Sequence, residues 1–192
     1  MPNRRLQSLE KAGRLSAFIS SKSLKKTCWL PVKTRWGTFR FLVSQRGLRR
    51  LRFPLRRNHT PRESAQLSCS ELRRARSELL RYLEGKSIRR GRLALDDGKW
   101  SNSKRMVLET IARIAPGEVR SYRWVAEQSG LGRGFRAVGQ ILKSNPLPIF
   151  FPCHRVVRQD GSLGGYQSGI RWKKRLLLHE RKVVFKKRKR DS

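Results

Sequence analysis

The chain has 192 residues, enough for one or two domains, and its 37% hydrophobic content suffices to bury a core, which excludes a disordered chain. Lysine and arginine number 47 against 13 acidic residues, a formal net charge of +34. Because such an excess repels itself, it is typical of proteins that bind a polyanion, and nucleic acid is the leading candidate. A generally basic proteome or a ribosome-associated role is the alternative. No long basic amphipathic helix favours a membrane surface, and no apolar stretch is long enough to span a bilayer.

Cysteine usage and the polar start of the chain predict an intracellular protein, cytoplasmic in a prokaryote or nuclear in a eukaryote. Residues 1–20 lack the apolar core of a secretory leader. The three cysteines, Cys28, Cys69 and Cys153, are too few and odd in number for a disulfide framework. With His59, the first two form no closely spaced ligand pair, so we predict no metal.

The first half predicts a small antiparallel sheet followed by a helix. Residues 1–24 form a basic, flexible segment, and residues 25–99 an α/β domain. Strands are expected over Cys28–Val32, Gly37–Gln45 and Leu48–Phe53, because apolar residues alternate there between turn signals. Residues 70–84 carry leucines at helical spacing and end at Gly85. A strand and then a loop are expected over residues 88–98.

The second half, residues 100–182, predicts a mostly helical domain. Helices are expected over 104–114, 122–128, 134–144 and 171–179, with a short buried strand over 149–151. Ser121 can cap the second helix. The second and third helices, joined by a turn with glycines, form a helix-turn-helix pattern. The basic tail, residues 183–192, is either a phosphate-binding arm, a nuclear-localisation signal or a solvated end.

Cys153 is the candidate nucleophile. An arbitrary cysteine is more often a small buried hydrophobic residue. Here Pro152 fixes the backbone before it, and His154 and Arg155 follow, a cationic setting that favours the thiolate. A water can connect His154 to the sulfur, and Glu180 is a candidate acid to orient the imidazole. A Cys/His hydrolase would use the same pair, but it gains nothing from a helix-turn-helix, whereas a protein that brings a thiolate to a DNA base does.

These motifs together resemble the O6-alkylguanine-DNA alkyltransferases, also called methylated-DNA–protein-cysteine methyltransferases. The resemblance covers about residues 100–182 in order and spacing. It rests on Ser121-Tyr122, Arg136-Ala137-Val138-Gly139, Asn145-Pro146, Pro152-Cys153-His154-Arg155-Val156, Gly161, Gly164-Gly165-Tyr166, Gly169, Lys173 and Leu176-Leu177-Leu178-His179-Glu180.

The resemblance implies an α/β two-domain fold. Its amino-terminal domain would be a ribonuclease-H-like unit with a small antiparallel sheet and helices, and its carboxy-terminal domain would be mostly helical and winged helix-turn-helix-like. The implied activity is DNA repair by a single, irreversible transfer of a methyl or other alkyl group from O6-alkylguanine, or O4-alkylthymine, in duplex DNA to Cys153. No cofactor is implied, and we expect a monomer.

The resemblance also implies a role for each matching residue. Cys153 would accept the alkyl group, His154 would act on the thiol through water, and Glu180 would orient His154. Asn145 would hold the turn before the active-site segment, and Tyr122 would stabilise the leaving guanine. The DNA contacts would come from Tyr122, Arg123, Arg136, Ala137, Gly139 and Ser103, with Arg136 replacing the extruded base. The guanine pocket would be lined by Val156, Tyr166, Gln167 and Ser168.

Two departures from the family pattern bear on substrate range and on the alternatives. Gln167 stands where a small polar residue is common, so bulky adducts would fit less well. Alkyltransferase-like proteins lack the acceptor cysteine, and Cys153 argues against that class. The competing readings are a non-transferring lesion-binding or regulatory protein of the same fold, and a basic helix-turn-helix protein whose cysteine is structural.

Overall fold

The computed structural model describes residues 27–54, 70–98 and 100–188 of the chain. Its first element is a three-stranded antiparallel sheet of order β1-β2-β3, formed by β1 (Cys28–Thr34), β2 (Gly37–Ser44) and β3 (Gly47–Arg52). Along β2, Phe39, Phe41 and Val43 are buried, as the alternating pattern predicts. The sequence therefore places one apolar face of this sheet toward the core, and the three predicted strands are confirmed.

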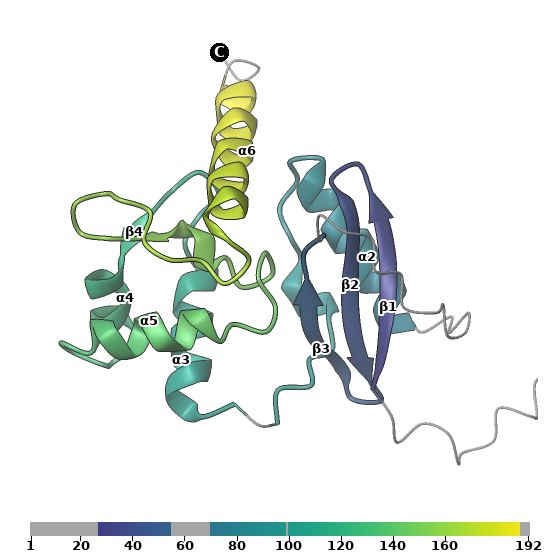
Figure 1. Cartoon of the computed structure of the whole chain (residues 1–192), viewed down its shortest axis with the longest axis horizontal. Helices are drawn as coiled ribbons and strands as arrows, with labels where there is room; N and C mark the ends of the chain where they lie inside the picture. Colours follow the sequence, from purple (N-terminus) through teal and green to yellow (C-terminus); the bar gives the residue numbers. More distant parts are fainter. Residues whose placement is uncertain (1–26, 55–69, 99, 189–192) are drawn as a thin grey trace, which may run out of the picture.

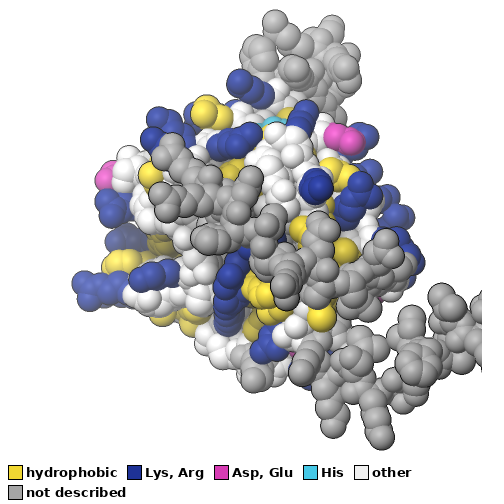
Figure 2. Space-filling model, turned by 45° about the vertical axis from the view of Figure 1, so that its right-hand side comes forward, with side chains coloured by type: hydrophobic (Ala, Val, Ile, Leu, Met, Phe, Trp, Pro, Cys, Tyr) yellow, Lys and Arg dark blue, Asp and Glu magenta, His cyan; other side chains and the backbone are white. Residues whose placement is uncertain are grey.

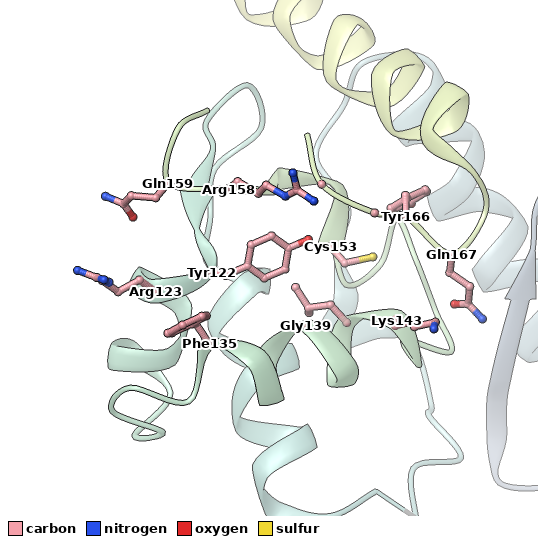
Figure 3. Close-up of a pocket in the computed structure, with 13 residues that line it drawn as sticks. Tyr122, Arg123, Phe135, Gly139, Lys143, Cys153, Arg158, Gln159, Tyr166 and Gln167 are labelled. Carbon is pink, nitrogen blue, oxygen red and sulfur yellow. The ribbon is translucent and has the colours of Figure 1, made fainter. Parts of the chain in front are cut away.

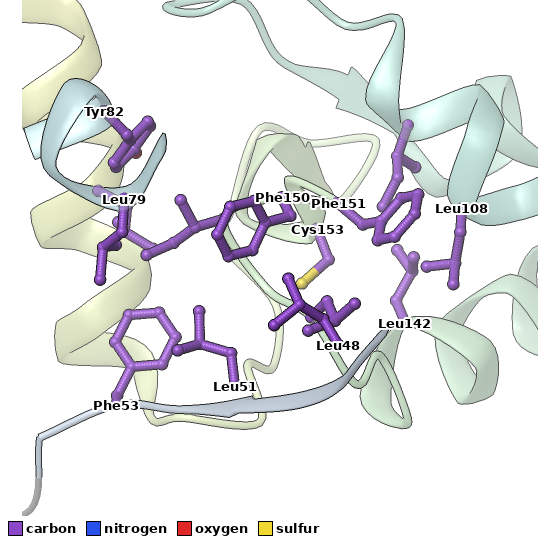
Figure 4. Close-up of a cluster of buried hydrophobic side chains, with 14 of the residues drawn as sticks. Leu48, Leu51, Phe53, Leu79, Tyr82, Leu108, Leu142, Phe150, Phe151 and Cys153 are labelled. Carbon is purple, nitrogen blue, oxygen red and sulfur yellow. The ribbon is translucent and has the colours of Figure 1, made fainter. Parts of the chain in front are cut away.

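Helix α2 (Ser70–Leu83) packs across all three strands and carries its buried residues on one side. The core continues from this sheet–helix pair into the second half of the chain. Figure 4 shows Phe150 lying between Leu79 and Tyr82 on one side and Leu108 and Leu142 on the other. The backbone N–H of Leu51 also donates to the carbonyl of Pro146 at 2.8 Å. The two halves thus share one continuous core.

The second half consists mainly of helices (Figure 1). They are α3 (Asn102–Ala112), α4 (Tyr122–Gln128), α5 (Phe135–Lys143) and the long α6 (Ile170–Arg188). A two-residue parallel pair joins β4 (Arg120–Ser121) to β5 (Val156–Val157). As predicted, Ser121 caps α4, because its hydroxyl accepts from the N–H of Trp124 at 3.1 Å.

Three sequence expectations differ from the structure. Residues 149–151 form a buried turn, where Ile149 has φ 76°, so the predicted strand is wrong. Residues 88–98 contain the short 3-10 helix η1 (Arg90–Arg92) and only an isolated bridge from Leu95 to Leu48. The last helix runs nine residues past the expected end at His179, to Arg188, so the start of the basic tail is helical.

The surface of the described residues is strongly basic. Lysine and arginine side chains are spread over the face in Figure 2, with acidic side chains at isolated points. No described helix is long and apolar enough to cross a membrane. Within the same residues no group of three or more His, Cys, Asp and Glu side chains is arranged to hold a metal, and His59 and Cys69 lie outside them.

Candidate active site at Cys153

Cys153 begins the short 3-10 helix η2 (Cys153–Arg155), directly after the buried turn and Pro152. It is 5% exposed. Asn145, just past the end of α5, fixes the turn that leads to it. The Asn145 side-chain N–H₂ group donates to the carbonyl of Phe151 at 2.8 Å and to the sulfur of Cys153 at 3.1 Å, while its oxygen accepts from the N–H of Leu147 at 3.1 Å. One buried amide therefore links the end of α5 to the thiol.

The next residue, His154, is fully buried and pairs with Glu180 of α6. Its Nε2 lies 2.7 Å from the carboxylate, and its Nδ1 has no hydrogen-bond partner among the described residues. Arg155 donates to the same carboxylate at 2.9 Å and 2.8 Å. The backbone N–H of Gly117 and the hydroxyl of Tyr82 complete the set at 3.1 Å and 2.9 Å. Because Glu180 accepts at Nε2, the neutral imidazole keeps its lone pair on Nδ1.

The electrostatics of these groups favour a neutral imidazole beside an ionised carboxylate. Burial alone would raise the pKa of Glu180, but the hydrogen bonds from His154 and Arg155 and the positive charge of Arg155 outweigh it and hold that pKa far below its ordinary value. Burial lowers the pKa of His154, although Glu180 opposes this. His154 is therefore a neutral acceptor at physiological pH, which a general base requires.

The thiol itself is held protonated by burial. Burial raises the pKa of Cys153, while the hydrogen bond from Asn145 and the positive charge of Lys173 act in the opposite direction. Lys173, on α6, is also buried, and its ammonium group donates to the carbonyls of Val156, at 2.5 Å, and Leu163. Burial lowers the pKa of Lys173 to about 8. A base near the sulfur is therefore needed to form the thiolate.

Cys153 opens onto a cavity of about 920 Å³ between α4, α5 and the loop that precedes α6. Figure 3 shows Tyr122 and Tyr166 on either side of the cysteine. Gly164, with φ +63°, lies so close to the Tyr122 hydroxyl that a Cβ there would be 3.2 Å from it, so glycine leaves room for the tyrosine. The residues that line the cavity are Tyr122, Arg123, Phe135, Gly139, Leu142, Lys143, Cys153, Arg158, Gln159, Gly164, Gly165, Tyr166 and Gln167.

Both tyrosines stay protonated at neutral pH. Burial, followed by the nearby Cys153, raises the pKa of Tyr122, and the same two causes raise the pKa of Tyr166 well above its ordinary value. The Tyr166 hydroxyl is buried without a well-oriented hydrogen bond to any described residue. The cavity thus presents two phenol groups that can donate to a ligand.

Part of the chain matches a known protein family. Residues 102–182 match the family described as "6-O-methylguanine DNA methyltransferase, DNA binding domain". This part of the chain is therefore similar to that family. Over 99 residues the chain is 40% identical to a methylated-DNA–protein-cysteine methyltransferase of Methanothermobacter thermautotrophicus, a match that covers 52% of this chain and 55% of that protein. The human protein of the same name is 43% identical over 77 residues, 40% of this chain and 37% of the relative. The chain therefore matches about half, or less, of the length of these curated relatives.

Solved structures extend the likeness to the first half of the chain. The crystal structure of Mycobacterium tuberculosis OGT in complex with DNA superposes with a TM-score of 0.65 at 28% identity, covering 81% of this chain and 93% of that one. A structure of an O6-methylguanine DNA methyltransferase from Methanococcus jannaschii gives a TM-score of 0.60 at 28% identity, covering 79% and 93%. The sheet and α2 thus share the α/β fold of these solved structures.

The structure brings together most of the site residues predicted from the sequence. Cys153, His154, Glu180 and Asn145 form one connected group, as described above. Of the predicted DNA-contacting and pocket residues, those that line the cavity are Tyr122, Arg123, Gly139, Tyr166 and Gln167.

The other predicted residues lie outside the cavity lining. Arg136 and Ala137 are exposed on α5, and Ser103 lies in the first turn of α3. Val156 is fully buried in β5, where its carbonyl accepts from Lys173. Ser168 is half-buried in the loop before α6.

The sequence reasoning missed several residues of this site. Phe135 is 42% exposed at the start of α5 and lines the cavity, as does Arg158. The place of Phe135 directly before Arg136 in the expected recognition helix was the available signal. Tyr82 had no signal, because only the tertiary fold brings it to Glu180.

Proposed function

We propose that this protein repairs DNA by direct reversal, transferring the alkyl group of O6-alkylguanine in duplex DNA irreversibly to the sulfur of Cys153. The observation that carries the proposal is the arrangement of Cys153: its buried thiol faces a cavity and is followed by a His154–Glu180 pair whose Nδ1 has no partner in the described part of the chain. This is the pattern of a nucleophile, a base and an orienting acid. The names of the curated relatives and the family match of residues 102–182 support the same activity.

The chemistry begins with removal of the thiol proton. A buried polar atom such as Nδ1 of His154 needs a partner, and a water bound there would relay the proton from Cys153 to the imidazole. The thiolate then attacks the alkyl carbon in line. The S–C bond forms as the C–O6 bond breaks, and the electron pair leaves with guanine. The guanine takes up one proton, which the protonated Tyr122 hydroxyl is suited to donate, and the His154 proton replaces it through solvent.

The product explains why the reaction happens once. A thioether has no easy leaving group, so the sulfur is not regenerated, and no metal or cofactor takes part in the scheme. The alkylated oxygen is out of reach inside a duplex, so the base must be turned out into the cavity. Arg136 is proposed to fill the resulting gap, while Tyr166 and Gln167, which line the cavity, contact the base, and Val156 and Ser168 support this pocket from outside its lining.

The DNA contact is proposed to use α5 as the recognition helix. Its exposed side carries Arg136, Ala137 and Lys143, and its buried side holds Val138 and Leu142. Arg123 and Ser103 would contact the backbone from neighbouring helices. The large positive charge supplies the sequence-independent attraction to phosphate.

We also propose the domain division expected from the sequence. Residues 25–99 would form a ribonuclease-H-like unit and residues 100–182 a winged helix-turn-helix-like unit, flanked by basic segments at 1–24 and 183–192. The packing of α4 against α5, with the parallel β4–β5 pair against α4, supports the second assignment. The protein would act as a monomer on DNA inside the cell.

The test is to incubate the protein with a duplex oligonucleotide containing O6-methylguanine and to measure the mass of the intact protein and its peptides. We expect a gain of one methyl, on the Cys153 peptide alone, that stops at one per molecule. Cys153→Ser should gain nothing, whereas the matched control Cys28→Ser should behave as the wild type. No gain in folded, reduced protein would contradict the transfer and favour a lesion-binding protein, and several turnovers would contradict the irreversible step.

A further inference from the structure

The carboxylate of Glu180 is bound by a residue from the other half of the chain. Tyr82 is near the end of α2, 98 positions before Glu180, and is 4% exposed. Its hydroxyl donates to Oε1 of Glu180 at 2.9 Å. This is the same oxygen that lies 2.7 Å from Nε2 of His154. Tyr82 is thus separated from the imidazole by a single carboxylate oxygen.

The position of Tyr82 is fixed from several sides. Its backbone carbonyl lies 2.8 Å from Nε2 of His179, the residue before Glu180 on α6. Its ring meets the ring of His179 edge-on, with centroids 5.4 Å apart, and that of His154 at 6.4 Å. The next carbonyl, of Leu83, accepts from Arg35 in the β1–β2 turn. The hydroxyl is therefore presented to Glu180 by a rigid part of the fold.

The two carboxylate oxygens of Glu180 are bound by different sets of donors. Oε2 is bound by the N–H of Gly117 and by Arg155, and Oε1 by Arg155, His154 and Tyr82. A carboxylate offers about four lone-pair sites, so these contacts saturate it. Of the three groups bound to Oε1, Arg155 and His154 belong to the second half of the chain. Tyr82 belongs to the first half, and its hydroxyl is an uncharged donor.

We propose that Tyr82 is a positioning residue for the transfer reaction, through which the first half of the chain orients Glu180 and so His154. This inference rests on the proposed function. The hydroxyl holds Oε1 where it accepts from Nε2, which keeps the proton on Nε2 and the lone pair of Nδ1 free to receive the thiol proton.

The charges around the pair give the proposal a pH signature. Glu180 raises the pKa of His154, while Arg155 and Lys173 lower it together with burial. Tyr82 keeps its proton because burial and Glu180 raise its pKa well above the ordinary value. Among the described residues, Cys153, Tyr166 and His179 are the other titratable groups near this pair. The Tyr82 hydroxyl offsets part of the negative charge on Oε1. Without it, this charge raises the pKa of His154 further, and the imidazole stays doubly protonated to higher pH.

The experiment compares the wild type with Tyr82→Phe in two assays over a range of pH. One is methyl transfer from an O6-methylguanine duplex under single-turnover conditions. The other is labelling of Cys153 by iodoacetamide, located by peptide mass, which does not depend on transfer. In both, the acid side of the profile reports the coupled Cys153–His154 pair, since an imidazolium cannot accept the thiol proton.

For Tyr82→Phe we expect the acid-side midpoint to rise by roughly half a pH unit and the plateau rate to fall about fivefold, with unchanged affinity for DNA. The control Thr110→Val removes a buried hydroxyl of α3 and should leave the midpoint in place. An unmoved or lowered midpoint overturns the proposal, even if the plateau falls, because general loosening lowers the rate at every pH. If the wild type labels but does not transfer, the proposed function fails, and the labelling profile still decides the role of Tyr82.

Discussion

Asn145→Ala offers a quantitative test of how the thiol is held. The substitution removes three hydrogen bonds, to the Phe151 carbonyl, the Cys153 sulfur and the Leu147 N–H. Both backbone groups belong to residues no more than 1% exposed, so water does not readily replace the lost partner. At about 1 kcal/mol for each bond, the free energy of unfolding should fall by roughly 3 kcal/mol. For a chain of this size, that lowers Tm by about 10 °C.

The same substitution should change the reactivity of Cys153. The hydrogen bond from Asn145 lowers the pKa of the thiol, so its loss should move the labelling of Cys153 by iodoacetamide to higher pH. Urea unfolding and thermal melting measure the stability, and peptide mass follows the labelling. The nearby Gln140→Ala, at an exposed position of α5, is the matched control and should cost less than about 0.5 kcal/mol. A loss under about 1 kcal/mol in Asn145→Ala, or labelling that shifts to lower pH, would refute this account of the turn.

Two further predictions concern DNA and pH. Arg136→Ala should slow transfer from duplex DNA at least about tenfold more than it slows the reaction with free O6-benzylguanine, because the free base needs no extrusion. Single-turnover rates measure both reactions. Equal losses in the two would show that Arg136 has another role. Lys173 should make folding stability rise with pH between about 8 and 10.5, because the unfolded chain holds the Lys173 proton up to its ordinary pKa while the folded protein releases it near 8. The difference in urea stability between the wild type and Lys173→Met isolates this slope, since the other groups titrate in both. Parallel pH profiles for the two proteins would contradict it.

The sequence predicted the parts of the site that local pattern controls. Cys153, His154 and Asn145 lie within ten residues of one another, and the capping of α4 by Ser121 follows from the residue type. The pairing of His154 with Glu180 was inferred as one possibility and made specific by a family resemblance. The strands and helices with regular apolar spacing were found for the same reason.

What the sequence did not reveal depends on tertiary contacts. An apolar run such as Ile149-Phe150-Phe151 is equally compatible with a strand and with a buried turn, and the left-handed φ of Ile149 is imposed by its surroundings. The extension of α6 follows from Val183 and Val184, which pack against Gly85 and Gly117 so closely that a Cβ at either glycine would lie within 3 Å of a valine methyl. Tyr82 depends on a contact across 98 positions, which no local pattern encodes.

The carboxylate of Glu180 also has a consequence for the order in which the protein forms. The carboxylate is on α6 and its partners come from α2, the segment after α3 and the Cys153 segment, so the full set of contacts exists only when distant parts of the chain have met. Loop closure over such separations is slow compared with helix formation. During synthesis, Cys153 emerges before Glu180 and has at that stage the reactivity of an ordinary cysteine. The hydrogen bonds that orient His154 through Glu180 are therefore completed late in folding.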